Sequence, residues 1–196
     1  MIKGSSTRRP QQPIVPLLLD RWSPRAMDGT AVSPAALARL LEAARWAPSS
    51  MNHQPWRFLY ALRGGAHWSA YLDFLRPGNR SWCEQAGALM VFLAKRTLDD
   101  GSPSPTHAFD TGAAWQNFAL QGYADGLVVH GMRGFDAERV RRTLGVPDSF
   151  GIEAMAAVGH PGELAMLPER FRARETPSDR KPVAELAHEG LFAFRG

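Results

Sequence analysis

Cysteine is almost absent from this chain of 196 residues, and so are several features that define other protein classes. The single thiol, Cys83, excludes a disulfide within the chain, which favours a reducing, cytoplasmic setting. No apolar run approaches the roughly 20 residues of a membrane-spanning helix. Residues 1–13 are polar and basic and lack the apolar segment of a secretory signal. We expect them to form a disordered leader.

The common sequence motifs of hydrolases, metal sites and nucleotide-binding loops are also missing. The chain has no His-Glu-x-x-His, no cysteine pair, no Gly-x-Ser-x-Gly, no Walker loop and no Gly-x-Gly-x-x-Gly. Its six histidines are scattered without the spacing of a metal site, and we expect no bound metal. If such a chain is an enzyme, a cofactor carries out the difficult chemical step.

The excess of positive over negative charge lies at the start of the chain. Residues 1–25 hold five basic residues against one acidic residue, which accounts for the whole net charge of +4. The basic isoelectric point raises the alternative of a nucleic-acid-binding domain, but such a domain carries a basic stripe on its folded body. Because the remainder of this chain is neutral overall, the pattern argues against a nucleic-acid partner.

The apolar pattern predicts a single α+β domain over residues 14–196. It has about four strands in a mostly antiparallel or mixed sheet, with helices on its faces. Helices are expected at 15–20, from Ser33-Pro34 to before Pro48, at 68–75 ending at Pro77-Gly78, at 110–125 and from Asp136 to Gly145; strands are expected at 56–62, 88–94, 127–129 and 152–158.

The last part of the chain, from about residue 162 to residue 196, has little periodicity. It nevertheless contains Leu186, Leu191, Phe192 and Phe194, and large apolar side chains gain free energy by leaving water. We therefore expect an extended arm that buries these side chains against a second copy of the chain, in a homodimer.

Three clusters of side chains indicate a planar, anionic cofactor. Arg21-Trp22-Ser23-Pro24-Arg25 offers two guanidiniums and a hydroxyl for a phosphate, with a basic surface turn as the alternative. The segment 47–56, Ala-Pro-Ser-Ser-Met-Asn-His-Gln-Pro-Trp, has amides suited to a heterocycle edge; a plain connecting turn explains only its first residues. Arg180-Lys181 is a second cationic pair, or else a solvated charge cluster.

These blocks resemble the nitroreductase family of FMN enzymes. The segment 47–56 is similar to the family's most distinctive motif, and Arg21-x-Ser23-x-Arg25 to its N-terminal basic motif. The similarity spans about residues 17–190, and the ordered set of blocks is far more specific than any one of them. The other blocks are Asp110-Thr111-Gly112-Ala113-Ala114 with Gly126-Leu127, Gly134-Phe135-Asp136, Leu144-Gly145-Val146-Pro147, Ala157-Val158-Gly159-His160-Pro161 and Asp179-Arg180-Lys181-Pro182.

The resemblance implies an FMN site at the interface of a homodimer. Four groups of contacts are implied: Arg21, Trp22, Ser23 and Arg25 at the phosphate and the pyrimidine edge, with Asn79 facing the isoalloxazine; Pro48, Ser49, Ser50, Asn52 and Gln54 reaching the flavin from the other subunit; the backbone of Arg133 and Gly134 next to N5; and Arg180 and Lys181 clamping the phosphate from the arm.

The implied activity is a ping-pong hydride transfer. NADH or NADPH would reduce FMN at N5, and a small electrophile such as a nitroaromatic, a quinone or an activated alkene would take the electrons. No side chain is assigned as catalytic, although Arg25 is expected to stabilise the reduced flavin. The alternatives are a specialised member of the fold (a dehalogenase, a flavin-fragmenting enzyme or a peptide dehydrogenase) and a flavin-binding protein without turnover.

Two features depart from the family pattern. Trp82 stands where some members have a lysine near the flavin, and the segment between Ala94 and Asp110 is short. The first departure leaves Arg25 as the cation expected at the flavin. The second implies a more open active site, so the choice of acceptor does not follow from the resemblance.

Overall fold

The computed structural model describes residues 2–194, so the first residue of the expected leader and the last two of the expected arm lie outside the described residues. Four strands form one sheet in the order β1-β2-β4-β3, and every pairing is antiparallel. The strands are β1 (Trp56–Leu62), β2 (Ala88–Lys95), β3 (Val128–Met132) and β4 (Phe150–Gly159). The predicted α+β class and its four strands are confirmed.

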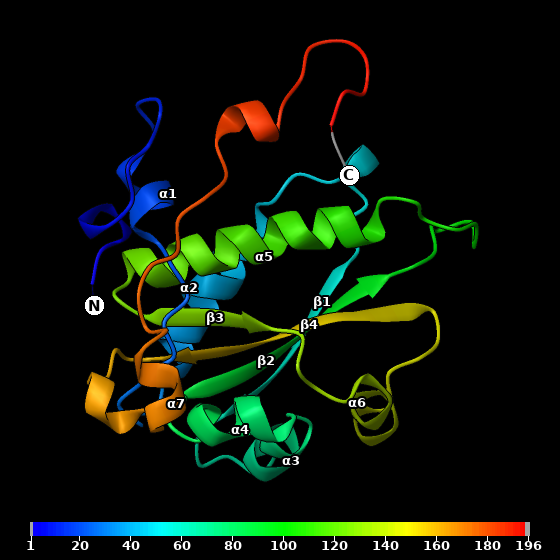
Figure 1. Cartoon of the computed structure of the whole chain (residues 1–196). Helices are drawn as coiled ribbons and strands as arrows, with labels where there is room; N and C mark the ends of the chain where they lie inside the picture. The colour runs from blue at the N-terminus through cyan, green and yellow to red at the C-terminus, as the bar shows by residue number, and fades with distance from the viewer. Residues whose placement is uncertain (1, 195–196) are drawn as a thin grey trace.

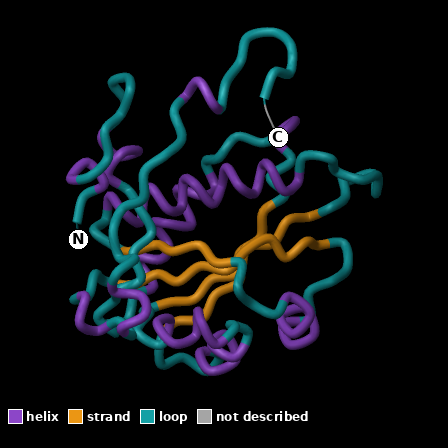
Figure 2. The backbone as a smooth tube through the Cα atoms, viewed as in Figure 1, coloured by secondary structure: helices purple, strands orange, loops and turns teal. Residues whose placement is uncertain are grey.

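Helices cover both faces of the sheet (Figure 1). On one face lie α2 (Pro34–Arg45) and α5 (His107–Ala124), whose Leu40 and Phe118 are fully buried. The other face is covered by α3 (Trp68–Asp73), α4 (Pro77–Cys83) and α6 (Ala137–Leu144). Figure 2 shows the strands as a continuous layer between these helices. Because β2 is buried on both faces, its sequence is apolar from Ala88 to Ala94 and does not alternate.

Local capping sets where several helices begin and end. The Ser33 hydroxyl accepts the Ala36 N–H at 3.1 Å, and an Asp136 carboxylate oxygen accepts the Arg139 N–H at 2.9 Å. Gly145 ends α6 in the left-handed conformation, with φ of 63°. The sequence predicted that one helix ends at Pro77-Gly78, but it did not predict the helix α4 that begins there. Pro77 begins α4, because proline at the first helical position loses no hydrogen bond.

The N-terminal segment packs against residues 177–183 of the arm near the C-terminal end of α5. The N-terminal segment forms η1 (Gly4–Ser6) and α1 (Pro16–Asp20), and the arm contains η3 (Leu164–Met166), α7 (Glu169–Arg172) and η4 (Val183–Glu185). The Arg8 Nε–H donates to the Ser178 carbonyl at 2.8 Å, and the Val183 N–H donates to Gln11 Oε1 at 2.9 Å. This packing differs from the disorder expected for residues 1–13. The contacts join segments too far apart in sequence for any local pattern to reveal.

Among the described residues, no helix combines the length and apolar character that crossing a bilayer requires.

We predict that the face of α5 toward the sheet contributes strongly to stability. The Phe118 ring is fully buried and meets Phe92 edge-on, with 5.4 Å between ring centroids. Phe118→Ala should lower the free energy of unfolding by about 3–5 kcal/mol, whereas Phe118→Leu should lower it by roughly 1–2 kcal/mol because less volume is removed. Urea denaturation measures both, and equal losses for the two variants would contradict this packing.

Candidate functional site

Five arginines line one cavity of about 370 Å³, which we call the arginine cavity. Hydroxyl groups of Ser23, Thr176 and Ser178 lie among them. Within the part of the chain that the structure describes, only one carboxylate, that of Glu175, lies within ion-pair distance of any of these guanidiniums. The cavity therefore carries a large excess of positive charge. Its arginines are Arg8, Arg21, Arg25, Arg174 and Arg180.

The segment that follows α1 supplies one wall of this cavity. Arg21 leaves the helix in an extended conformation, and residues 21, 23 and 25 all line the cavity, as does Trp22. The Arg21 Nη1–H donates to the Ser23 hydroxyl at 3.2 Å. Burial lowers the pKa of Arg21, and the neighbouring charges of Arg8 and Arg180 lower it further. The arm thus brings Arg180 to the predicted basic motif.

The second cation predicted in the arm lies elsewhere. Lys181 lines an adjoining cavity of about 400 Å³, which shares Arg8 and Arg180 with the arginine cavity. Both residues of the predicted pair therefore line the adjoining cavity, but only Arg180 also lines the arginine cavity.

Glu175 is the main residue that sequence reasoning missed. Its carboxylate is 7% exposed and accepts the backbone N–H groups of Arg25 and Ala26, the latter at 2.8 Å. It also lies 3.5 Å from Arg25 Nη1. The charge of Arg25 is therefore partly compensated within the chain. Glu175 was hidden because it lies in a polar tail 150 residues from Arg25, and no motif links the two.

His130 in β3 forms another part of the lining. Its Nδ1 lies 2.9 Å from the Pro24 carbonyl, and burial is the main cause that lowers its pKa to about 4. The ring packs on Trp82, with 4.7 Å between centroids. Trp82 is itself buried, and its Nε1–H has no hydrogen-bond partner among the described residues. At neutral pH, His130 is therefore an uncharged part of the cavity lining, beside the arginines.

At the end of β3, three predicted residues come together. The Asn79 Nδ2–H donates to the Gly134 carbonyl at 3.1 Å, and the Arg76 N–H reaches the same oxygen at 3.0 Å. A Cβ at position 134 would lie 2.6 Å from Asn79 Nδ2, so only glycine permits this approach. The Gly134 N–H donates to no group in residues 2–194, and Arg133 is exposed beside it. This edge strand thus joins the arginine cavity to a second set of polar groups.

The predicted loop of residues 48–54, which contains η2 (Ser50–Asn52), lies at the opposite end of α5. Its Ser50 N–H donates to Asp110 Oδ2 at 3.3 Å, near the start of the helix. At the other end of the helix, burial raises the pKa of Tyr123, and the charge of Asp20, which is next to Arg21, raises it further. α5 has 18 residues and is about 27 Å long. Figure 1 shows the loop at one end and the N-terminal segment at the other. One chain does not bring this loop to the arginine cavity.

Backbone strain distinguishes the same loop. Met51, Asn52 and Gln54 have φ of 49°, 57° and 48°, in the left-handed region that costs non-glycine residues about 1–2 kcal/mol each. The Gln54 N–H donates to the Ser49 hydroxyl at 3.0 Å, and Gln54 Nε2 donates to the Asn52 carbonyl at 3.1 Å. Strain in an exposed loop indicates a functional constraint on its shape.

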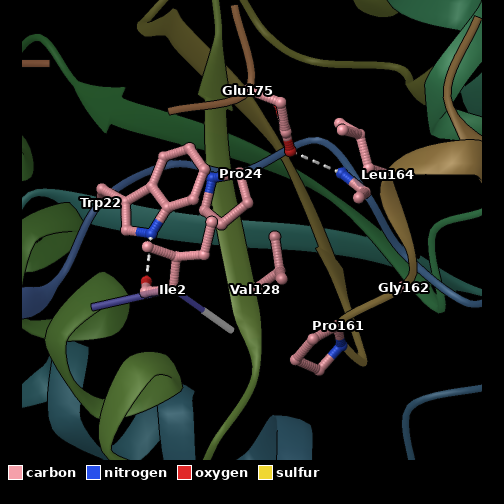
Figure 3. Close-up of a pocket in the computed structure, with 9 residues that line it drawn as sticks. Ile2, Trp22, Pro24, Val128, Pro161, Gly162, Leu164 and Glu175 are labelled. Atoms are coloured by element: carbon pink, nitrogen blue, oxygen red, sulfur yellow. Dashed lines mark hydrogen bonds between the residues drawn. The ribbon is translucent and has the colours of Figure 1, made fainter. Parts of the chain in front are cut away.

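A second, apolar cavity of about 380 Å³ lies beside the arginine cavity (Figure 3). Trp22 lines both, and its Nε1–H donates to the Ile2 carbonyl at 2.7 Å. The polar atom of the predicted contact residue Trp22 is therefore bonded within the chain. Among the described residues, no group of three or more histidine, cysteine, aspartate or glutamate side chains is placed to hold a metal ion.

The low pKa of His130 predicts a specific acid sensitivity. Since the folded state holds this proton less readily than the unfolded chain, the stability from neutral His130 is complete above about pH 6.5 and is lost as the pH falls toward 4. Between pH 7 and pH 5 the loss should be on the order of 2 kcal/mol. His130→Asn keeps a donor for Pro24 but does not titrate. Denaturation curves should show the two proteins converging in stability at pH 5, and parallel pH profiles would contradict the assignment.

Comparison with known proteins places this geometry in a family. The sequence model of the Nitroreductase family matches residues 18–81 and 69–160. An uncharacterized 15.4 kDa protein of Mycolicibacterium smegmatis is 32% identical over 145 residues, covering 69% of this chain and 97% of that protein. An NADH dehydrogenase of Thermus thermophilus is 29% identical over 197 residues, covering 83% of this chain and 91% of the relative. A solved structure described as an oxidoreductase containing FMN aligns with a TM-score of 0.93 and 41% identity, over 96% of this chain and 97% of the other. The chain belongs to the nitroreductase family.

Proposed function

We propose that this protein is an FMN-dependent oxidoreductase that takes electrons from NADH or NADPH and delivers them to a small electrophile. The observation that carries the proposal is the arginine cavity joined by β3 to the Asn79–Gly134 contact. A phosphate and a flat polar ring require these two kinds of donor. The FMN of the similar oxidoreductase and the name of the Thermus thermophilus relative support the same cofactor and the same kind of donor.

The residues present fit an FMN molecule. Arg21, Ser23 and Arg180 supply charge-assisted donors for the phosphate, in a cavity whose positive charge is nearly uncompensated. The Asn79 amide and the free Gly134 N–H supply donors for the edge of the ring. When bound, FMN supplies the redox chemistry, a ping-pong hydride transfer at N5 from the nicotinamide to an acceptor such as a nitroaromatic, a quinone or an activated alkene.

The chain's own contribution is to position groups and to set the electrostatic field. Arg25 places a cation on the cavity wall, and Glu175 limits its effective charge. His130 stays neutral and adds no further cation. The Gly134 backbone presents a donor that no side chain shields, because a Cβ there would meet Asn79. These groups act on charge that develops at the ring edge.

We further propose that the site is shared between two copies of one domain spanning residues 14–196. The strained loop with Pro48, Ser49, Ser50, Asn52 and Gln54 is exposed or half-exposed, and α5 separates it from the arginine cavity of its own chain. Leu186, Leu191 and Phe192 of the arm (residues 162–196) are 60%, 87% and 85% exposed. Burying each would contribute about 1.5–3 kcal/mol. A twofold dimer would cover the arm and bring the loop to its partner's arginine cavity.

Subunit mixing tests this proposal. Arg21→Gln and the double variant Asn52→Ala/Gln54→Ala should each weaken FMN binding at least about tenfold. In a mixed dimer, one site would carry every substitution and the other none. An equimolar mixture should therefore regain tight FMN binding, and reduction of that FMN by NADH or NADPH, at about a quarter of its sites, because about half of the dimers are mixed.

The controls separate the parts of the proposal. Each variant mixed only with itself should recover nothing. Mixed dimers that form but regain no tight site would show that each site lies within one chain. Wild-type protein that binds no FMN, or whose FMN neither nicotinamide reduces, would contradict the enzymatic proposal itself.

The Arg25–Glu175 pair predicts two opposite shifts in the redox potential of bound FMN. Arg25→Gln removes a cation that favours the reduced form, and the midpoint potential should fall by roughly 30–60 mV. Glu175→Gln leaves Arg25 uncompensated and should raise the potential. Glutamine keeps an oxygen for the N–H groups of Arg25 and Ala26. Spectroelectrochemical titration measures both shifts, and FMN affinity should change less because Arg21 and Arg180 remain. Shifts of the same sign would refute the assigned roles.

A further inference from the structure

Arg8 is a buried arginine in a segment outside the family match, which begins at residue 18. It is 6% exposed, yet no carboxylate in the described chain pairs with it. Its Nε–H donates to the Ser178 carbonyl, and its Nη1 donates to the carbonyls of Leu19 and Arg21, all at 2.8 Å. These bonds join the N-terminal segment to both walls of the arginine cavity, the α1 side and the arm.

The Arg8 guanidinium still has donors available. Three of its five N–H groups make these bonds, and the two on Nη2 make none with residues 2–194. Arg8 lines the arginine cavity itself. Asp20 and Asp179 are the nearest acids, and their carboxylates accept N–H groups of Ser5 at 3.0 Å and Arg180 at 2.8 Å. Arg8 is thus a desolvated cation on the cavity wall with unused donors.

The rest of the N-terminal segment holds Arg8 in place. We call residues 2–13 the N-terminal clasp. The clasp is tied to the Trp22 indole through the Ile2 carbonyl (Figure 3), to Asp20 through Ser5 and to the arm through Gln11. A Cβ at Gly4 would lie 2.1 Å from the Leu19 carbonyl and 2.8 Å from Arg8 Nη1. Glycine at position 4 therefore leaves the space that the Leu19 carbonyl and the Arg8 guanidinium occupy.

We propose that Arg8 binds the FMN phosphate through Nη2 and that the N-terminal clasp closes one side of the phosphate site. The inference rests on the proposed function, since it assigns a further residue to the same cofactor. Burial and the charge of Arg180 lower the pKa values of Arg8 and Arg21 alike, so these cations repel one another in the cavity. A phosphate removes that repulsion, and its binding stabilises the closed clasp.

The experiment compares FMN with riboflavin, which has the same ring and no phosphate. Titration of the full-length apoprotein, followed by flavin fluorescence, gives both dissociation constants. Arg8→Gln should raise that of FMN about 10- to 100-fold, the effect of losing a charge-assisted hydrogen bond, and leave that of riboflavin within about threefold. Arg142→Gln is the control, because Arg142 in α6 is exposed, lies outside the clasp and does not line the arginine cavity. It should change neither constant more than about threefold.

Other outcomes would contradict either the role of Arg8 or the proposed function. An unchanged FMN constant in Arg8→Gln, or an equal loss for both flavins, would show that Arg8 does not bind the phosphate. If Arg8→Gln weakens only FMN but Arg142→Gln does the same, the effect comes from general charge and the proposal fails. Wild-type protein that binds neither flavin would instead overturn the proposed function.

A measurement on the wild-type protein needs no variant to fold. Hydrogen–deuterium exchange of the full chain should show that saturating FMN slows exchange in residues 4–8 and 178–181, whereas saturating riboflavin does not. Equal protection by the two flavins, or none by FMN, would overturn the link between the clasp and the phosphate.

Discussion

Repulsion among like charges at one edge of the sheet is the constraint on which the site depends. Five arginines share one cavity. Among the described residues, only the carboxylate of Glu175 forms an ion pair with any of these five. The chain holds them together with neutral groups. Backbone carbonyls accept from Arg8, a hydroxyl accepts from Arg21, and His130 is kept uncharged by burial. Such an arrangement is costly until an anion enters. The cavity is therefore suited to an anion, which would neutralise part of this positive charge.

The sheet and α5 determine which other groups lie near the arginine cavity and which lie far from it. β3 leads from His130 to Gly134, where glycine allows the Asn79 amide to approach the backbone. α5, which is about 27 Å long, then separates the loop of residues 48–54 from the cations of the same chain. A helix of this length does not bring its two ends together, so the loop lies away from the arginine cavity of its own chain. In the proposed twofold dimer, the loop of one copy would lie at the cavity of the other.

Local signals account for most of what the sequence predicted. Ser33-Pro34, Asp136 and Gly145 act within a few residues of themselves, and the apolar run of β2 reflects burial on both faces. The short helix α4 was missed because Pro77-Gly78 ends one element and begins the next. The motif at residues 21–25 indicated a phosphate site, but Arg8, His130, Arg174 and Glu175 were not found. They reach the cavity through contacts between distant segments, and nothing in their own neighbourhoods distinguishes them from solvated residues.

Backbone strain in the loop and repulsion in the arginine cavity both lower the stability of the unliganded chain. The loop carries Met51, Asn52 and Gln54 in left-handed conformations, and the cavity carries cations that repel one another. Neither feature stabilises the isolated chain, because left-handed backbone costs free energy and like charges repel. An anion in the cavity would reduce the repulsion among the arginines. Free energies of binding and of folding are then linked. An anion that binds only the folded chain would therefore raise its free energy of unfolding, so the order of the segments around the arginine cavity would depend on occupancy of that cavity.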